Sequence, residues 1–379
     1  MSPAPGNPSA QAHDRDELAA FLPRLIALCA CDSPTGDAGA VDAAAELLAG
    51  WAAEAGLEVE SFETPKGAHL RIALDGGGEG RTLLIGHHDT VWPLGEGVAR
   101  PVQVTGERAL GPGTADMKGG LLVGLAAMER LAHGSDGGFG RVELHSLPDE
   151  EARLGAPARA DLFAGADAAL VLECGRESGA VVGSRNGATW IEVEARGRSA
   201  HAGQDLADGR SALHAAIAEV ARIEGLAAER PELQVTATRL LSDGPGNAVA
   251  GAATINFDVR SRSPEALAWA LERAGEFGDH DGVELTATTA AGFPPMERDA
   301  ALVERTLAEL ERAGAPVAEE HAGGASDGCW TSTLGIPTVD GLGPIGGCDH
   351  SEEEWLDLSS VGPRVEVVAR LCATGGEPA

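Results

Sequence analysis

Residues 81–93 read RTLLIGHHDTVWP, a short apolar run that ends in two histidines and an aspartate. An apolar run of this length followed by polar and turn residues predicts a buried strand of a largely parallel sheet. In an open α/β sheet, site residues lie at the carboxyl ends of the strands. The stretch therefore predicts an α/β fold and a polar site that begins at His87.

Four further segments place a metal-ligand type at the end of an apolar run or in a glycine-rich loop. They are GPGTADMKGG with Asp116, LPDEE with Glu151, LVLECG with Glu173 and GGCDHS with His350. Imidazole and carboxylate groups are common ligands of zinc. With His87, this repeated placement predicts a dinuclear metal hydrolase.

In the HHD triplet, His87 can bind a metal ion and Asp89 can orient it. In extended backbone, residues i and i+2 point to the same face, so Asp89 can contact His87 while His88 points away. A carboxylate beside a ligating imidazole fixes its tautomer and raises its basicity. The alternative is that both histidines are solvated loop residues.

The carboxylates of the next two segments need separate roles. Two neighbouring carboxylates repel each other unless cations or a proton neutralise them, so we expect Glu151 to bind metal and Glu150 to act as general base toward a metal-bound water. Asp116 can bridge two cations through its two oxygens. Taken alone, the acidic pair could be a solvated turn, and Asp116 could cap the helix that follows it.

Composition excludes several classes of function. The 379 residues allow two domains, and a formal net charge of −31 disfavours nucleic acid and anionic membranes as partners. The six cysteines lack the paired spacing of a structural zinc site. We expect no membrane association and a cytoplasmic location, since the N-terminal sequence lacks an apolar signal segment and no later run is long enough to span a bilayer.

Alternating helical and strand patterns predict the domain organisation. Up to residue 183 the order is typical of a mostly parallel sheet with helices on both faces. Residues 184–292 then follow the order β-α-β-β-α-β, which predicts an inserted α+β lid. Residues 293–379 complete the first domain, which explains why His350 lies so far along the chain from the other candidate ligands.

The five ligand segments, in this order and at these separations, resemble the superfamily of dinuclear zinc exopeptidases and amidohydrolases. That superfamily includes glutamate carboxypeptidases, aminoacylases, acetylornithine deacetylases and succinyl-diaminopimelate desuccinylases. The similarity runs from about Asp32 to the C-terminal helix and is greatest to bacterial folate-cleaving glutamate carboxypeptidases. It rests on the ligand loops, on SPTGDAGAVDAAAELLAGWAAEAGLEVE and on RNGATWIEVEARGRSAHAG.

The resemblance implies a division of the ligands between two Zn²⁺ ions, for which Co²⁺ or Mn²⁺ can substitute. His87 and Glu173 would hold one ion, Glu151 and His350 the other, and Asp116 would bridge them. The same resemblance implies Glu150 as the base and Asp89 as the orienting carboxylate. It also implies a homodimer formed through the lid.

Lid residues also match functional positions of the family. The resemblance implies that His201 reaches the partner subunit's site and stabilises an oxyanion, and that Asn247 and Arg260 bind the substrate's free carboxylate. Gly343 matches a glycine whose backbone lines the specificity pocket. Structural alternatives are that His201 caps a turn and that Arg260 pairs with Asp258.

One departure limits the substrate assignment. Folate-cleaving relatives carry an arginine before the proline where the lid returns to the first domain, whereas this chain has Phe293 before Pro294. We therefore expect a carboxypeptidase-like hydrolase of amide or peptide bonds next to a free carboxylate, with a small peptide or N-acyl amino acid as substrate. The alternatives are an N-acyl-amino-acid deacylase of the same superfamily and a catalytically silent metal-binding homolog.

Overall fold

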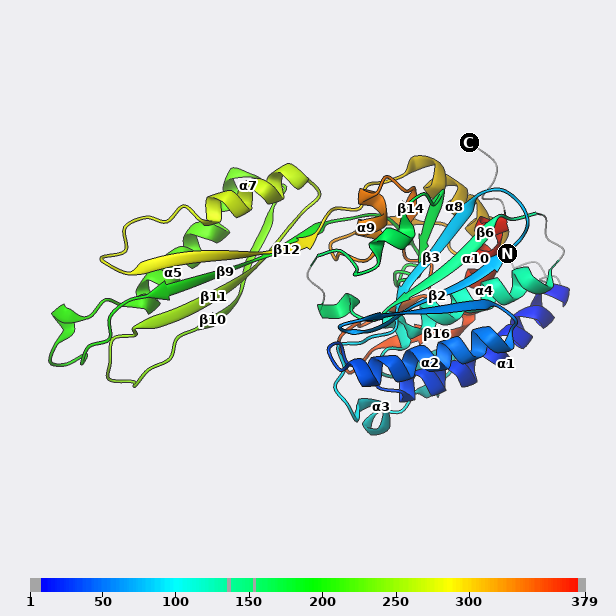
Figure 1. The fold of residues 1–379 in the computed structure, drawn as a ribbon, viewed down its shortest axis with the longest axis horizontal. Coiled ribbons are helices and arrows are strands. Elements are labelled where there is room, and N and C mark those ends of the chain that lie inside the picture. The colour runs from blue at the N-terminus through cyan, green and yellow to red at the C-terminus, as the bar shows by residue number, and fades with distance from the viewer. Residues whose placement is uncertain (1–7, 135–137, 153–154, 374–379) are drawn as a thin grey trace, which may run out of the picture. The chain divides into compact units, whose positions relative to one another are not determined.

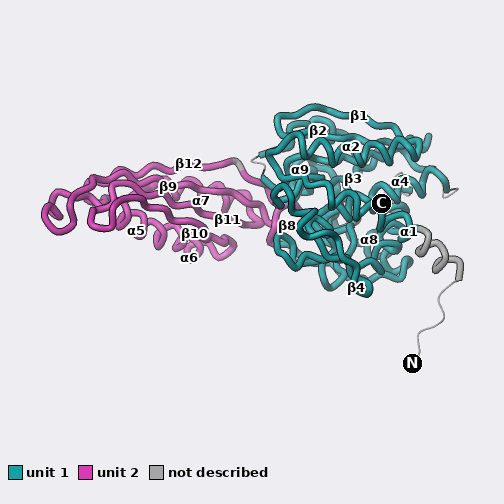
Figure 2. The backbone as a smooth tube through the Cα atoms, turned by 90° about the horizontal axis from the view of Figure 1, so that it is seen from below, with its two compact units in different colours: residues 1–184, 297–322, 326–379 teal, residues 185–296, 323–325 magenta. Residues whose placement is uncertain are grey.

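A computed structural model describes residues 8–134, 138–152 and 155–373. The chain divides into two compact units (Figure 2). Unit 1 comprises residues 1–184, 297–322 and 326–379, and unit 2 comprises residues 185–296 and 323–325. The patterns in the sequence gave no indication that residues 323–325 join the second unit.

Unit 1 is built on a six-stranded sheet in the order β1-β2-β6-β3-β7-β14 (Figure 1). β3 pairs in parallel with β6 and β7, and β7 pairs in parallel with β14. β1 and β2 form an antiparallel edge. The predicted α/β class with a mainly parallel sheet is confirmed. The strands are β1 (Glu58–Thr64), β2 (Gly67–Asp75), β3 (Arg81–His87), β6 (Arg141–Leu147), β7 (Ala168–Val171) and β14 (Thr338–Val339).

Alternating side chains give this sheet two buried faces. Leu84 of β3 packs into the main core with the long helices, whereas Leu83 and Ile85 face a second core that contains Phe163. This is the period of two that an extended backbone imposes. The helices of unit 1 are α1 (Pro8–Ala30), α2 (Ala38–Glu54), α3 (Glu96–Ala99), α4 (Gly119–His133), α8 (Ala300–Arg312), α9 (Gly328–Thr333) and α10 (Val361–Ala373).

Pro23 lies in the interior of α1, where proline removes a backbone hydrogen bond. Its ring is exposed, while Phe21 and Leu25 on the same helix are buried in the main core. Core packing of the apolar residues around it therefore offsets the hydrogen bond that proline cannot make.

Short strands complete unit 1 and link distant parts of the chain. A second sheet has the order β15-β16-β5-β4, and β13 pairs with β8. β16 pairs with β5, which joins the segment after His350 to the segment before Asp116. These strands are β4 (Gln103–Thr105), β5 (Arg108–Leu110), β8 (Val181–Arg185), β13 (Glu319–Ala322), β15 (Gly346–Gly347) and β16 (Trp355–Asp357).

Unit 2 is an antiparallel sheet in the order β10-β11-β9-β12, covered by helices. Its chain order, β9, α5, β10, β11, α7, β12, is the predicted β-α-β-β-α-β order, with a short α6 after α5. Ser263 caps α7, with Pro264 in its first turn. The elements are β9 (Gly187–Arg196), α5 (Ala212–Glu224), α6 (Leu226–Glu229), β10 (Gln234–Leu241), β11 (Ala252–Ser261), α7 (Pro264–Ala274) and β12 (Glu284–Phe293).

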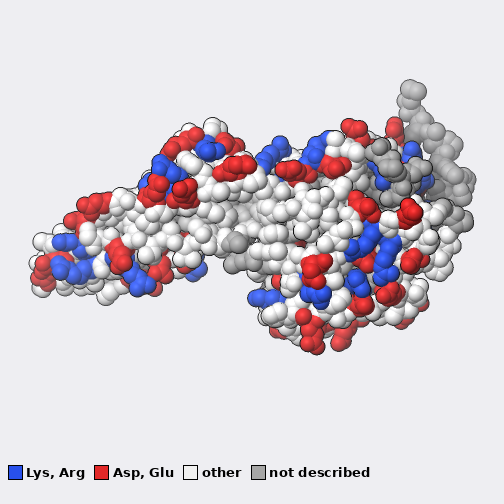
Figure 3. All heavy atoms as spheres, turned by 45° about the horizontal axis from the view of Figure 1, so that its top comes forward, with Lys and Arg blue, Asp and Glu red and all other residues white. Residues whose placement is uncertain are grey.

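Charged side chains of both signs are mixed on the surface. On the face drawn in Figure 3, acidic and basic side chains are interspersed over both units rather than gathered by sign. Across the described residues, no helix combines the length and the apolar character needed to cross a bilayer.

Candidate metal centre

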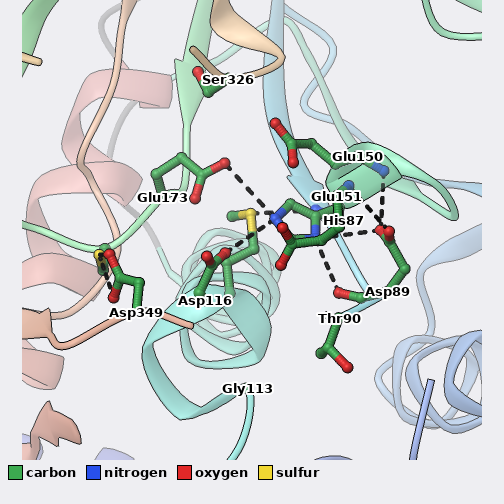
Figure 4. Close-up of polar contacts among 12 residues, drawn as sticks. His87, Asp89, Thr90, Gly113, Asp116, Glu150, Glu151, Glu173, Ser326 and Asp349 are labelled. Atoms are coloured by element: carbon green, nitrogen blue, oxygen red, sulfur yellow. Dashed lines mark hydrogen bonds and ion pairs between the residues drawn. The ribbon is translucent and has the colours of Figure 1, made fainter. Parts of the chain in front are cut away.

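The candidate site lies at the carboxyl ends of three neighbouring parallel strands. β3 ends at His87, the turn after β6 carries Glu150 and Glu151, and Glu173 follows β7 by two residues. Because β3 lies between β6 and β7, His87 is flanked by these carboxylates (Figure 4). This is the placement that an open α/β sheet favours for its functional residues.

Asp116 lies between two histidines and presents one oxygen to each. Its Oδ1 is 3.2 Å from His87 Nε2, and its Oδ2 is 3.1 Å from His350 Nε2. His87 Nε2 is also 3.8 Å from Glu173 Oε1, and His350 Nε2 is 3.0 Å from Glu151 Oε2. Two groups of potential ligands result, and both contain Asp116. They are His87, Asp116 and Glu173, and Asp116, Glu151 and His350, each with ligand atoms within 4.8 Å of one another.

The cap role considered for Asp116 is wrong. Helix α4 begins at Gly119, its N-cap position is Lys118, and no side chain caps it. The ammonium of Lys118 instead donates to the carbonyls of Leu28 and Cys31 at the end of α1, at 3.0 and 2.8 Å. The loop is thereby anchored to α1, and the Asp116 carboxylate is left for the site.

Close packing of glycines holds the Glu173 segment in place. A Cβ on Gly120 would lie 1.8 Å from the Leu172 carbonyl oxygen, and one on Gly343 would lie 2.5 Å from the same oxygen. The Gly343 amide also donates to the Glu173 carbonyl at 2.9 Å. Gly343 therefore has a packing reason to be glycine beside the specificity role that the resemblance implies.

The electrostatics of the two groups favour added positive charge. Burial is the largest cause that raises the pKa of Glu151, and repulsion from Asp116 adds to it. The same two causes help to raise the pKa of Glu173 well above its usual value. Among the described residues, no lysine or arginine forms an ion pair with either carboxylate, and Glu151 Oε1 is buried without a hydrogen-bond donor. Since uncompensated buried carboxylates are costly, the donor set fits divalent cations.

The histidines respond to the same excess of negative charge. Hydrogen bonds to Asp116 and Glu151 raise the pKa of His350 to about 11. Burial acts to lower the pKa of His87, yet hydrogen bonds to Asp116 and Asp89 raise it well above its usual value. Without cations, protons must therefore neutralise the site, and metal binding would displace them.

Asp89 contacts both His87 and the turn that carries Glu150 and Glu151. It is buried, and its Oδ1 is 3.3 Å from His87 Nδ1. The same carboxylate accepts the backbone N–H groups of Glu150 and Glu151, at 3.1 and 3.2 Å, and the Thr35 hydroxyl at 2.6 Å. The predicted contact with His87 is present, and Asp89 in addition fixes the turn that carries both glutamates. No local pattern predicts the contact with Thr35, which lies 54 residues away.

His88 points away from the site, as the strand geometry predicted. It is buried, and its Nδ1 lies 2.8 Å from the Ser146 hydroxyl. Burial lowers the pKa of His88 to about 3, so it is neutral at ordinary pH. The solvated-loop alternative is therefore wrong for this pair of histidines, since His87 is buried as well.

Glu150 and Glu151 are separated as the division of roles requires. Glu151 belongs to a ligand group and Glu150 does not. Repulsion from Glu150 is nevertheless among the causes that raise the pKa of Glu173, so its carboxylate lies near the ligands. Figure 4 shows the Glu150 side chain extending from the turn after β6 toward the side of the site that holds Glu173.

His350 enters the site from a tight loop after β15. Its backbone has a φ of 60° and that of Cys348 has a φ of 61°, so two non-glycine residues adopt the left-handed region. Such conformations are uncommon and often occur at functional sites. The His350 side chain is 53% exposed, which makes it the most accessible member of the two ligand groups.

The residues predicted on the lid belong to unit 2. His201 and Asn247 lie on adjacent segments, with the Ala202 amide donating to the Asn247 carbonyl at 2.9 Å. His201 is exposed, and its Nδ1 accepts the Gly203 N–H at 3.2 Å. The turn-capping alternative is therefore present, and it leaves Nε2 for another partner.

Arg260 has the alternative partner that the sequence suggested. Its Nε and Nη2 donate to the two Asp258 oxygens at 2.7 and 3.1 Å. Its Nη1 donates to the Gly323 carbonyl at 3.1 Å, next to Gly324, which binds Arg185 Nη1 at 3.1 Å. Both arginines therefore hold the short segment 323–325 within unit 2.

Comparisons with known proteins agree with this geometry. Residues 83–374 match the family model described as peptidase family M20/M25/M40. The chain belongs to this peptidase family. A match of that extent includes every segment of the candidate metal centre.

Individual M20 relatives point to amide and peptide hydrolysis. The chain is 28% identical over 374 residues to carboxypeptidase G2 of Pseudomonas sp. (strain RS-16), covering 94% of this chain and 89% of the relative. It is 47% identical over 78 residues to an acetylornithine deacetylase of Vibrio campbellii, which covers 20% of each chain. Hydrolysis of amide or peptide bonds is therefore the activity class of this M20 chain.

Solved structures support the fold over nearly the whole chain. A tripeptidase from Staphylococcus aureus superposes with a TM-score of 0.79 at 21% identity, covering 94% of this chain and 98% of that one. An M20 metallo-carboxypeptidase from Sulfolobus solfataricus gives a TM-score of 0.75 at 15% identity, with coverages of 94% and 99%. The family match over residues 83–374 and the near-full-length relative confirm the predicted resemblance to the exopeptidase and amidohydrolase superfamily.

Proposed function

We propose that this M20 chain is a dinuclear-metal hydrolase that cleaves an amide or peptide bond next to a free carboxylate. The observation that carries the proposal is the pair of ligand groups that share Asp116, one carboxylate oxygen facing each histidine. Two Zn²⁺ ions suit this set of imidazole and carboxylate donors, and Co²⁺ or Mn²⁺ can substitute.

The residues would divide the chemistry as follows. His87 and Glu173 would hold one ion, Glu151 and His350 would hold the other, and Asp116 would contribute to both sites. When bound, such ions polarise the scissile carbonyl and acidify water.

Glu150 supplies the proton transfer. It takes a proton from the attacking water and delivers it to the leaving amine. Asp89 keeps His87 in one tautomer and one orientation. The position of Glu150 beside the ligands but outside both ligand groups supports this role.

Substrate recognition is assigned to unit 2. Arg260 and Asn247 bind the free carboxylate, and His201 stabilises the oxyanion with its Nε2. Asp258 accepts from Nε and Nη2 of Arg260, and the Gly323 carbonyl accepts from Nη1, so a substrate must either use the remaining N–H groups of Nη1 and Nη2 or displace one of these partners. Phe293 in place of the relatives' arginine favours a leaving amino acid other than glutamate.

Carboxypeptidase action is the first proposal and N-acyl-amino-acid deacylation the second. The near-full-length similarity to carboxypeptidase G2 favours the first, and the local 47% identity to acetylornithine deacetylase favours the second. The presence of Glu150 argues against a catalytically silent metal-binding homolog. A cytoplasmic homodimer formed through unit 2 completes the proposal.

The test is chelation followed by the addition of Zn²⁺ or Co²⁺, with amine release measured on substrates that vary the acyl group and the amino acid independently. We expect activity to vanish on chelation and to return with metal. Turnover of peptidyl substrates would favour the carboxypeptidase, and turnover of simple N-acyl amino acids the deacylase. No turnover of any substrate at full metal loading would contradict both.

The assignment of His201 to the partner's site has its own test. An inactive Glu150→Ala chain and an inactive His201→Ala chain are mixed to form heterodimers, and part of the activity should return. No recovery in verified heterodimers would contradict action across the dimer.

A further inference from the structure

Glu354 is a buried carboxylate that belongs to neither ligand group. It follows His350 by four residues, and its exposed fraction is 0%. Its Oε1 accepts the backbone N–H groups of Ala115 and Asp116 at 2.9 and 3.1 Å. Its Oε2 accepts the Gly113 N–H at 2.9 Å and the Trp92 indole N–H at 3.0 Å.

Four N–H donors converge on the Glu354 carboxyl group. Backbone amides and the indole N–H only donate, and each Glu354 oxygen accepts two of them. Among the described residues, no lysine or arginine forms an ion pair with Glu354. Glutamine in its place could accept only two of these four N–H groups, because its amide nitrogen only donates.

Glu354 joins three segments that carry metal ligands. Trp92 follows the strand end that carries His87, Gly113 opens the loop that carries Asp116, and Glu354 itself lies on the segment after His350. The contacts span 238 to 262 residues of sequence. The backbone adds a further link, because the Gly111 N–H donates to the Glu354 carbonyl at 3.2 Å.

Arg100 also links Trp92 to the segment that carries Glu354. The Arg100 guanidinium lies 4.3 Å from the centre of the Trp92 ring, and its Nη1 donates to the Glu352 carbonyl at 3.1 Å. The ring is thus held at its N–H by Glu354 and over its face by Arg100. Both contacts fix the chain after His87 to the chain after His350.

We propose that Glu354 is a positioning residue that sets metal affinity by fixing the Asp116 loop between His87 and His350. The inference rests on the proposed dinuclear function. Asp116 can serve two ions only if its backbone stays where each oxygen faces one histidine, and Glu354 binds the N–H of Asp116 itself. A loop that loses this anchor separates the two ligand groups.

The test replaces Glu354 with glutamine and measures metal binding directly. Metal content is followed against buffered free Zn²⁺, and the visible absorption spectrum is recorded with Co²⁺. Since loss of a group that orients ligands typically weakens metal binding 10–100-fold, we expect a fall of about that size and a changed cobalt spectrum.

Two matched controls separate positioning from general stability. Glu353→Gln removes an exposed carboxylate next to Glu354 and should leave both readouts at wild-type values. Glu143→Gln removes a buried carboxylate elsewhere in unit 1 and should lower the melting temperature without changing metal affinity. A Glu354→Gln protein with wild-type metal affinity and spectrum would overturn the proposal, whatever its melting temperature.

A milder variant covers the case in which Glu354→Gln does not fold. Trp92→Phe removes one of the four donors and keeps an aromatic ring, so we expect a smaller loss of metal affinity in a folded protein. Unchanged affinity in Trp92→Phe would then overturn the proposal. A wild-type chain that binds no metal would instead contradict the proposed function itself, which distinguishes the two failures.

Discussion

Two clusters of histidine and carboxylate in the described part of unit 1 differ in what neutralises the acids. One is the metal-ligand pair of groups that share Asp116. The other lies on the sheet between β2 and β6, where His69 Nε2 is 3.0 Å from His145 Nδ1 and His145 Nε2 is 3.4 Å from Glu143. We call His69, Glu143 and His145 the sheet cluster.

Arginines complete the sheet cluster. Arg81 Nε and Arg141 Nε each donate to a Glu143 oxygen at 2.8 Å. Burial acts to raise the pKa of Glu143, but hydrogen bonds from His145, Arg141 and Arg81 lower it below its usual value. In the ligand groups the pKa of Glu151 is raised, and no described arginine or lysine pairs with it.

Residue type alone therefore does not identify a metal site. Both clusters combine imidazoles and carboxylates at hydrogen-bond distance inside the same unit. Only in the sheet cluster are the carboxylate oxygens paired with guanidinium groups, whereas in the described ligand groups their cationic partners are the histidines themselves. A buried carboxylate without a permanently charged partner favours a bound metal ion.

Glu150→Gln should have the largest effect on activity. It removes the proposed base and leaves all the proposed ligands in place. We expect the turnover number to fall by about 10²–10⁴-fold, because general base catalysis typically contributes that much. Metal content, measured by elemental analysis, should stay at the wild-type value. Loss of metal from this variant would show that Glu150 and Glu151 do not divide their work as proposed.

Glu143→Gln tests the other side of the comparison. The substitution leaves Arg81 and Arg141 without their carboxylate, and these side chains are 22% and 29% exposed, so water compensates them in part. We expect the free energy of unfolding to fall by about 2–3 kcal/mol. Urea denaturation measures it. Metal content should not change, and a variant that lost metal would break the distinction between the two clusters.

The smallest expected effect concerns the pH dependence of stability. Burial lowers the pKa of His145, while Glu143 partly opposes that shift. The unfolded chain therefore binds a proton at this histidine at a higher pH than the folded chain does. Stability from the neutral imidazole is then complete above the ordinary histidine pKa of about 6.5 and is lost as the pH falls below it.

His145→Gln should remove this contribution. We expect the slope of unfolding free energy against pH, between about pH 6.5 and pH 5, to be flatter than in the wild type by at most about 1.4 kcal/mol per pH unit. Denaturation of both proteins in the same chelating buffers isolates the difference. Equal slopes would mean that His145 titrates alike in the folded and unfolded chains.

Local patterns were enough to predict the main strands and the order of elements in unit 2. The alternation of Leu83, Leu84 and Ile85 predicts a strand with two buried faces, and the step of two residues predicts the contact between His87 and Asp89. These features depend on backbone periods that any short stretch reveals. The resemblance to the exopeptidase superfamily then predicted which distant ligand segments come together.

Other parts of the site depend on contacts that no local pattern encodes. Thr35 meets Asp89 across 54 residues, and Glu354 meets Gly113 across 241. No local pattern predicts the sheet cluster either, because His69 and His145 become neighbours only when β2 pairs with β6. For Arg260, both a substrate-binding role and a pair with Asp258 were predicted, and the structure contains the pair with Asp258.

Metal content of the purified chain tests the central claim most directly. Elemental analysis after dialysis against buffered Zn²⁺ should find two ions per wild-type chain. Asp116→Asn should bind fewer, because both ligand groups share that carboxylate. A wild-type chain with no bound metal, or an Asp116→Asn chain that keeps both ions as tightly as the wild type, would contradict the account.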